Sequence, residues 1–179
     1  MLQKIESSLL ENKKAVLFVV KLVGIYLFWQ GVYDYILTPY TPIDNWLINT
    51  IIGGAEWGLV QLGYDLMPAN SVYHHHMGIQ GTSGVIIGTP CDGLSLFILY
   101  TSFVLVFSGK WWTKLLFILP GIVFIHFLNV IRVIALALIV KYYPDTLDFH
   151  HSYTFTLFVY ACIFLLWVFR INIYQKTKY

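Results

Sequence analysis

Three segments of the sequence carry side chains that could together perform acyl transfer. Cys91 lies in a turn flanked by proline and glycine, Arg132 lies inside an apolar run, and His150 and His151 precede another apolar run. A thiol, a guanidinium and an imidazole supply the nucleophile, the charge stabiliser and the proton carrier for this chemistry. A nearby arginine or imidazolium also favours the thiolate, the reactive form of cysteine. We therefore predict a cysteine-based site in which these groups meet.

Each of these residues also has a purely structural interpretation. A lone cysteine is usually a small buried hydrophobe, but Cys91 lies in a turn at the water interface, where a thiol is accessible. Arg132 costs several kcal/mol inside a spanning helix unless it faces protein or water, so it marks a site by default. Asn129 and His126 precede it at steps of three residues and form a polar stripe, which could instead make hydrogen bonds between helices.

The composition places the chain in a membrane. Hydrophobic residues make up 58% of the 179 residues and charged residues only 11%, which is far from the balance of a soluble domain. The net charge of +2 is too small and too dispersed to indicate a nucleic-acid partner. Lipid is therefore the predicted surrounding, and we expect no nucleic acid to bind.

Apolar runs then define the architecture. A helix needs about 20 apolar residues to cross the hydrocarbon. Four runs reach or approach that length: 15–33, 94–107, 115–140 and 153–169. The second and fourth are short, which implies tilt, a thinned bilayer or helices that extend further. The sequence predicts an all-α polytopic membrane protein, a small bundle of about four transmembrane helices, with residues 1–179 as a single membrane domain.

Basic residues predict the orientation of this bundle. They gather on one side of the predicted spans, at Lys4, Lys13, Lys14, Lys110, Lys114, Arg170, Lys176 and Lys178. By the positive-inside rule this side, with both termini, is cytoplasmic. The first run has no small-x-small cleavage pattern after it, so we interpret it as a retained anchor. Residues 34–93 then form a loop region outside the membrane.

Two parts of this loop region have patterns of their own. Segment 43–67 mixes aromatic, apolar and acidic residues, which favours an interfacial helix broken at Gly53-Gly54, with a re-entrant hairpin as the alternative. Segment 73–90 has short β-compatible pieces punctuated by glycines, which predicts a β-hairpin followed by a turn. The hairpin would deliver Cys91 to the membrane surface.

The remaining cysteine and histidines are predicted to be structural. Cys162 lies nine residues into the last run, roughly 13 Å deep, so we expect no disulfide with Cys91. The consecutive residues His74, His75 and His76 cannot all face one ion without strain, and no cysteine or carboxylate lies nearby at ligand spacing. We predict neither a metal site nor a cofactor.

The second half of the chain resembles the exosortase/archaeosortase family of membrane transpeptidases, most closely the exosortase F type of Bacteroidetes. The resemblance rests on a Cys-x-Gly turn at Cys91 and Gly93, an Asn-x-x-Arg at Asn129 and Arg132, and a histidine before the last span. The first half is similar only in its anchor and its outer loop.

The resemblance implies an activity and a set of site residues. Cys91, Arg132 and His151 would be catalytic, and the sequence His-Ser-Tyr-Thr-Phe favours His151, with His150 as the alternative. Asn129, Asp92 and Gly93 would support them. Many members have serine or asparagine where this chain has Asp92, and a carboxylate at that position would disfavour a thiolate.

The implied reaction is membrane-embedded peptide cleavage and transfer to an acceptor. Family members act at the outer face of the bacterial cytoplasmic (inner) membrane on exported proteins whose C-terminal signals contain a short motif, a spanning helix and a basic tail. The alternative is a non-catalytic assembly subunit in which Arg132, His126 and Asn129 bind a partner helix or an anionic lipid. A small transporter is less favoured, because the sequence lacks an inverted repeat and the expected carboxylates.

Overall fold

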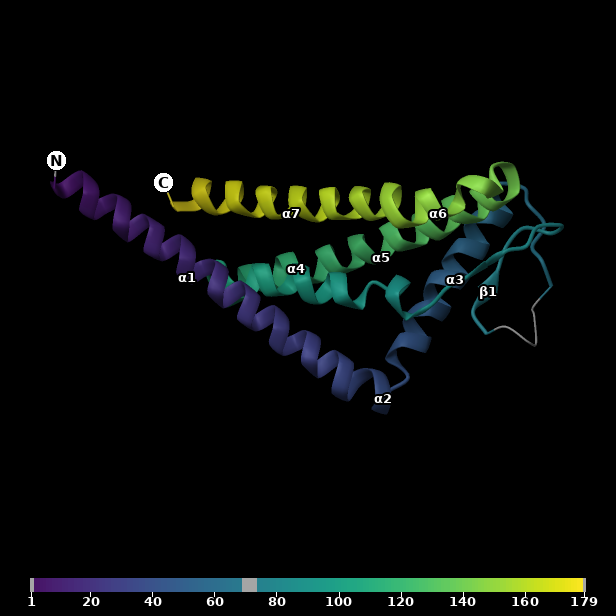
Figure 1. Cartoon of the computed structure of the whole chain (residues 1–179), viewed down its shortest axis with the longest axis horizontal. Helices are drawn as coiled ribbons and strands as arrows, with labels where there is room; N and C mark the ends of the chain where they lie inside the picture. Colours follow the sequence, from purple (N-terminus) through teal and green to yellow (C-terminus); the bar gives the residue numbers. More distant parts are fainter. Residues whose placement is uncertain (1, 69–73, 179) are drawn as a thin grey trace.

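The computed structural model describes residues 2–68 and 74–178, so residues 1, 69–73 and 179 of the predicted membrane domain lie outside the described residues. The described chain is mostly helical. Its long helices are α1 (Leu2–Val32), α3 (Ile43–Gln61), α4 (Leu94–Val106), α5 (Trp111–Tyr142) and α7 (Phe155–Lys178). The start of α1, the α4–α5 turn and the end of α7 lie toward one end of the long axis, and the hairpin lies at the other (Figure 1).

Three helical segments in the described chain are long and apolar enough to cross a membrane, which makes the chain a multi-pass membrane protein. They are Ala15–Tyr40, Trp111–Tyr142 and Pro144–Ile173. The first includes a π-helical turn, η1 (Tyr33–Leu37), and α2 (Thr38–Tyr40), so it is longer than the predicted run. The last contains η3 (Pro144–Thr146), α6 (Leu147–Phe149) and the π-helical η4 (His150–Thr154) before α7.

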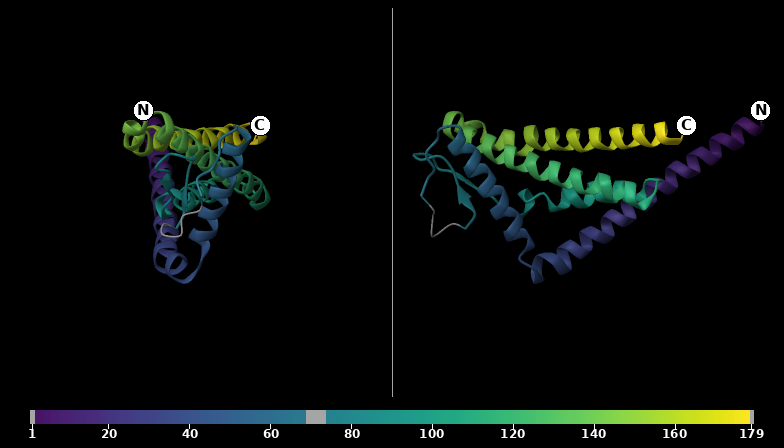
Figure 2. Two further views of the ribbon diagram at one scale, coloured as in Figure 1. Left: turned by 90° about the vertical axis from the view of Figure 1, so that its right-hand side faces the viewer. Right: turned by 180° about the vertical axis from the view of Figure 1, so that it is seen from behind.

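Helix α4 is the short member of the bundle. Its 13 residues span about 20 Å, against a hydrocarbon thickness of about 30 Å. Tyr100, Phe103 and Val104 are buried where α4 packs against α1, α5 and α7. The Tyr100 hydroxyl donates a hydrogen bond to the Phe117 carbonyl of α5 at 2.8 Å. Seen from behind in Figure 2, α7 runs alongside α5 while α1 crosses near the α4–α5 turn. Protein therefore surrounds much of α4.

Helix α3 runs unbroken through Gly53-Gly54, so the predicted break is wrong and so is the re-entrant hairpin. Its buried face packs along α5. A Cβ at Gly54 would lie 3.2 Å from the Val130 side chain, and a Cβ at Gly58 would lie 2.6 Å from Ile134. Gly54 and Gly58 leave room on this face for the side chains of α5, so the two helices approach closely within a continuous α3.

The predicted hairpin is present and is anchored to the helices. Strand β1 (His76–Met77) pairs antiparallel with β2 (Val85–Ile86). Met77, Ile79 and Ile87 are buried against α3 and α5. The 3₁₀ turn η2 (Thr89–Cys91) follows β2 and leads into α4. The hairpin therefore fixes the position from which the Cys91 turn begins.

Candidate active site

Cys91 is held in a tight turn before α4. Its amide donates to the Gly88 carbonyl at 2.9 Å. Gly93 has φ +86°, a left-handed conformation that favours glycine. A Cβ at Gly93 would overlap Nδ2 of Asn129 on α5, so the turn lies directly against that helix. The turn thus holds Cys91 just before the N-terminal end of α4.

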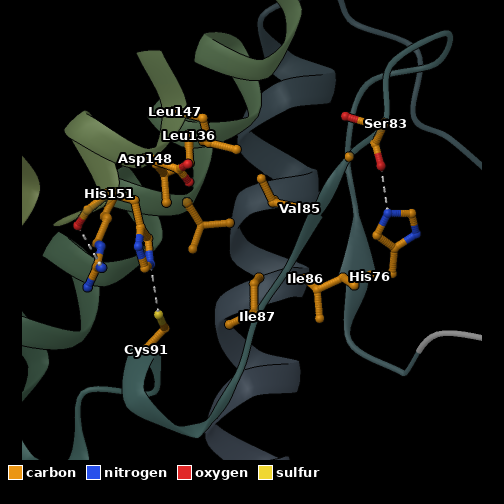
Figure 3. A pocket seen from close by; sticks show the side chains of 13 residues that line it. His76, Ser83, Val85, Ile86, Ile87, Cys91, Leu136, Leu147, Asp148 and His151 are labelled. Carbon is orange, nitrogen blue, oxygen red and sulfur yellow. Dashed lines mark hydrogen bonds between the residues drawn. The ribbon is translucent and has the colours of Figure 1, made fainter. Parts of the chain in front are cut away.

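His151 lies beside this thiol. Its Nε2 is 3.4 Å from Sγ of Cys91, and the two side chains point toward each other in Figure 3. His151 belongs to the π-helical turn η4, a rare geometry that is frequent at functional sites. His150 is engaged elsewhere, because its Nδ1 lies 3.1 Å from Oγ1 of Thr154. Of the two histidines, the structure places only His151 at hydrogen-bonding distance from Cys91.

Arg132 extends from α5 to the main chain of His151. Its Nη2 donates to the main-chain carbonyl of His151 at 3.5 Å, and Thr156 Oγ1 donates to that carbonyl at 3.3 Å. Nε of Arg132 is buried and has no hydrogen-bond partner among the described residues. Arg132 therefore contacts the His151 backbone and lines the same cavity as Cys91, and its Nε keeps a donor without a partner among the described residues.

A cavity of about 320 Å³ joins these groups. Cys91, Arg132 and His151 line it together with β2 of the hairpin, and Val133, Leu136 and Leu147 form an apolar wall. Its size lies at the lower end of the range for ligand sites, and its mostly apolar lining with a few polar groups is typical of them.

Asp92 is turned away from the cavity and into the protein. It is 2% exposed, and its Oδ1 accepts a hydrogen bond from the Leu94 amide at 2.8 Å. Tyr33 Oη donates to its Oδ2 at 3.4 Å. Burial raises the pKa of Asp92 to about 7, the Leu94 amide opposes this rise, and the buried Asp44 adds to it. Below that pH the carboxyl is mainly neutral, which weakens the expected unfavourable effect of Asp92 on a neighbouring thiolate.

Tyr33 and Asp44 were not predicted as partners of Asp92. Asp44 stands in the first turn of α3 and is 6% exposed, and one of its carboxylate oxygens has no hydrogen-bond partner among the described residues. In the sequence, the feature that could have indicated Asp44 was a carboxylate within a largely apolar segment. Its proximity to Asp92 arises only because α1, α3 and the Cys91 turn converge in the fold.

Asn129 lies on the face of α5 that contacts the Cys91 turn. It is 1% exposed, and neither atom of its amide has a hydrogen-bond partner in the part of the chain that the structure describes. An interhelical hydrogen bond, the structural interpretation of the polar stripe, is thus not formed by Asn129 in that part. His126 lies one turn earlier on α5, and its Nδ1 is likewise buried without a partner there.

The other singled-out residues lie in separate surroundings. Cys91 and Cys162 are both free, and they pack against different hydrophobic clusters. His76 lies in β1, and its Nε2 is 2.9 Å from the Ser83 carbonyl, so it contributes to closing the hairpin.

Comparison with known proteins gives one finding. The family model described as Transmembrane exosortase (Exosortase_EpsH) matches residues 12–168. No curated protein and no solved structure matches the chain significantly.

Proposed function

The chain belongs to the transmembrane exosortase family, whose members are transpeptidases, and from this premise we propose that Cys91 is its catalytic nucleophile. The observation that carries the proposal is the distance of 3.4 Å between Cys91 Sγ and His151 Nε2 in a cavity that Arg132 also lines. Its substrates would be exported proteins that carry a C-terminal sorting signal with a motif, a spanning helix and a basic tail.

The first half-reaction forms a thioester. His151 takes the proton of the Cys91 thiol; the thiolate attacks the scissile carbonyl carbon, and the carbonyl oxygen becomes an oxyanion as the S–C bond forms. The positive charge of the Arg132 guanidinium, which lines the cavity, stabilises this oxyanion. His151 then gives a proton to the leaving amine as the C–N bond breaks, and the C-terminal part of the substrate departs.

The second half-reaction regenerates the Cys91 thiolate and the protonated His151. The amine of an acceptor, or water, attacks the thioester carbonyl, and His151 accepts the proton of the nucleophile. The C–S bond breaks and Cys91 is released. Transfer requires that the acceptor reach the thioester before water does, and the apolar wall of Val133, Leu136 and Leu147 limits the water around it.

We place this site on the outer side of the cytoplasmic membrane, with both termini inside. Lys110 precedes α5, Lys114 lies in its first turns, and Arg170 lies in the second half of α7. The α4–α5 turn and the end of α7 lie toward one end of the long axis, and the hairpin lies at the other (Figure 1). The positive-inside rule then puts this basic end in the cytoplasm. A substrate helix docked against the bundle would bring its cleavage motif to the outer end, so docking supplies proximity. The His-Ser-Tyr-Thr-Phe sequence at 151–155 favours the exosortase F type.

The test is replacement of Cys91 by alanine in the native host, followed by mass spectrometry of proteins that carry candidate C-terminal signals. Cys162→Ala is the matched control, because it removes the other free cysteine from a different part of the bundle. We expect full-length, unprocessed substrates in Cys91→Ala cells and normal processing in the control.

Unchanged processing of every candidate signal in Cys91→Ala cells would refute the proposal. If Arg132 were then needed only for assembly of a membrane complex, the non-catalytic subunit would be the better description. Pull-down of the Arg132→Leu protein with its membrane neighbours separates these outcomes.

A further inference from the structure

Within the part of the chain that the structure describes, the hairpin presents one unpaired strand edge. In an antiparallel pair, the main-chain groups of successive residues point alternately toward and away from the partner strand. The Ile87 amide donates to the His75 carbonyl at 3.0 Å, and His76 is opposite Ile86. Ile87 and Val85 therefore face β1, whereas the N–H and C=O of Ile86 point away from it.

The opposite edge of the hairpin is already covered. The Met67 amide donates to the Gly78 carbonyl at 3.0 Å, and the Gln80 amide donates to the Asp65 carbonyl at 2.8 Å. Residues 65–67 thus lie along the outer side of β1 and its continuation. The free edge of this small sheet is the β2 edge.

This free edge borders the cavity of the candidate active site. Val85, Ile86 and Ile87 line the same cavity as Cys91 and His151. Among the described residues, none of the hydrogen bonds found reaches the main chain of Ile86. Figure 3 shows β2 passing beside the cavity on its way to the Cys91 turn. Unpaired main-chain donors and acceptors therefore lie on the wall of the cavity that contains the nucleophile.

We propose that the free edge of β2 binds the substrate's cleavage segment as an added strand, with main-chain hydrogen bonds to Ile86. This inference rests on the proposed function and names how its site holds a peptide. An exposed strand edge is a template for pairing with an extended chain, and peptide-binding domains use it so that the backbone supplies affinity and side-chain pockets supply specificity.

The cavity also restricts the chemistry of the occupant. Val133, Leu136 and Leu147 line the same cavity as β2, and this apolar surface would receive an apolar side chain of the added strand. Side chains alternate in a strand, so the neighbouring residues would point outward. The occupant is an extended peptide with an apolar residue near the scissile bond, and its carbonyl carbon reaches Cys91 where β2 leads into the turn.

The test compares two electrophiles on full-length protein in lipid nanodiscs, in a Cys162→Ala background. Methyl vinyl sulfone is the small probe, and N-acetyl-Ala-Val-Ala vinyl methyl sulfone is the peptide probe. The thiol adds to the β-carbon of the vinyl group, and its proton ends on the α-carbon, so no other reagent is needed. Mass spectrometry of the Cys91 adduct gives the rate of reaction with each probe. The ratio of the peptide-probe rate to the small-probe rate reports peptide binding. We expect the peptide probe to react faster.

Two substitutions separate the main chain of Ile86 from its side chain. Ile86→Pro removes the outward N–H and keeps the bonds to β1, whereas Ile86→Ala keeps the N–H and shortens an exposed side chain. Losing the donor should lower the ratio of the peptide-probe rate to the small-probe rate by about tenfold, a much larger loss than the one caused by Ile86→Ala. Equal effects of the two substitutions would overturn the inference.

A probe modification tests the same point on the protein with Ile86 intact. N-methylation of a peptide amide removes one donor, and in an added strand only alternate amides face β2. We expect N-methylation to slow the labelling of Cys91 when it is placed at alternate positions of the probe. At the positions in between, the labelling rate should change little. An even response along the probe, or no advantage of the peptide over the small probe, would overturn the inference. A Cys91 inert toward both probes would count against the proposed function itself.

Discussion

Replacing Gly93 by alanine probes the contact that holds the Cys91 turn against α5. Gly93 has φ +86°, and an added Cβ would overlap Nδ2 of Asn129. The turn or the Asn129 amide must therefore move, and Cys91 lies only two residues away. Gly63→Ala is a matched control, since Gly63 has φ +84° with nothing within 4 Å of an added Cβ.

Both substitutions place alanine in a left-handed backbone conformation, but only the one at Gly93 creates an overlap with Asn129. A left-handed conformation costs a non-glycine residue roughly 1–2 kcal/mol, so both variants should lose about that much stability. The Gly93 variant must also relieve a contact well inside normal packing distance, and a displacement of roughly 1 Å near reacting groups can reduce activity about a hundredfold. We expect Gly63→Ala to remain nearly fully active and Gly93→Ala to lose most of its activity.

The assay is a double-mutant cycle with Asn129→Ala, measured by thermal unfolding in detergent and by cleavage of a sorting-signal peptide. Truncating Asn129 makes room for the new methyl group, so the two substitutions should couple favourably in stability by about 1 kcal/mol or more. Equal activity of the Gly93 and Gly63 variants, or purely additive stabilities in the cycle, would refute the reasoning that this contact positions the turn.

Three further outcomes are expected. Arg132→Lys keeps the charge but loses the planar donor group, so peptide cleavage should fall by about tenfold or more, and full activity would contradict its role at the oxyanion. His151→Ala should reduce the cleavage rate by about a hundredfold or more, whereas His150→Ala should change it by about twofold at most; equal losses would leave the choice of His151 unsupported. Asp92 has a pKa of about 7 in the folded protein, above its usual value, so the folded state binds more protons and stability should fall as pH rises from about 4 to 7. Asp92→Asn should flatten that dependence in thermal unfolding scans, and an unchanged slope would count against Asp92 as its source.

Much of the fold followed from hydropathy because lipid imposes a simple rule. Apolar runs near 20 residues must be helices, since the hydrocarbon offers no partner for unpaired backbone groups. The hairpin was also predictable, because glycines punctuate short β-compatible pieces. The continuous α3 was not, because Gly53-Gly54 has the same appearance in sequence whether it bends a helix or lets two helices approach.

Sequence by itself determined which residues of this protein could do chemistry. Three features are unusual in so apolar a sequence, whatever their arrangement in space. They are a cysteine in a tight turn, an arginine within an apolar run and histidines at the start of another apolar run. Residue type also determined that Gly93 could adopt a left-handed turn.

Only the tertiary structure decided which of these residues meet. Helix packing sets the distance between Cys91 and His151 and gives His150 a different partner. It also brings Asp44 and Tyr33 around Asp92 and leaves the β2 edge open beside the thiol. The physical reason is that these groups lie up to 60 positions apart in the chain, so their distances depend on how α1, α3, α5 and α7 pack rather than on any local spacing.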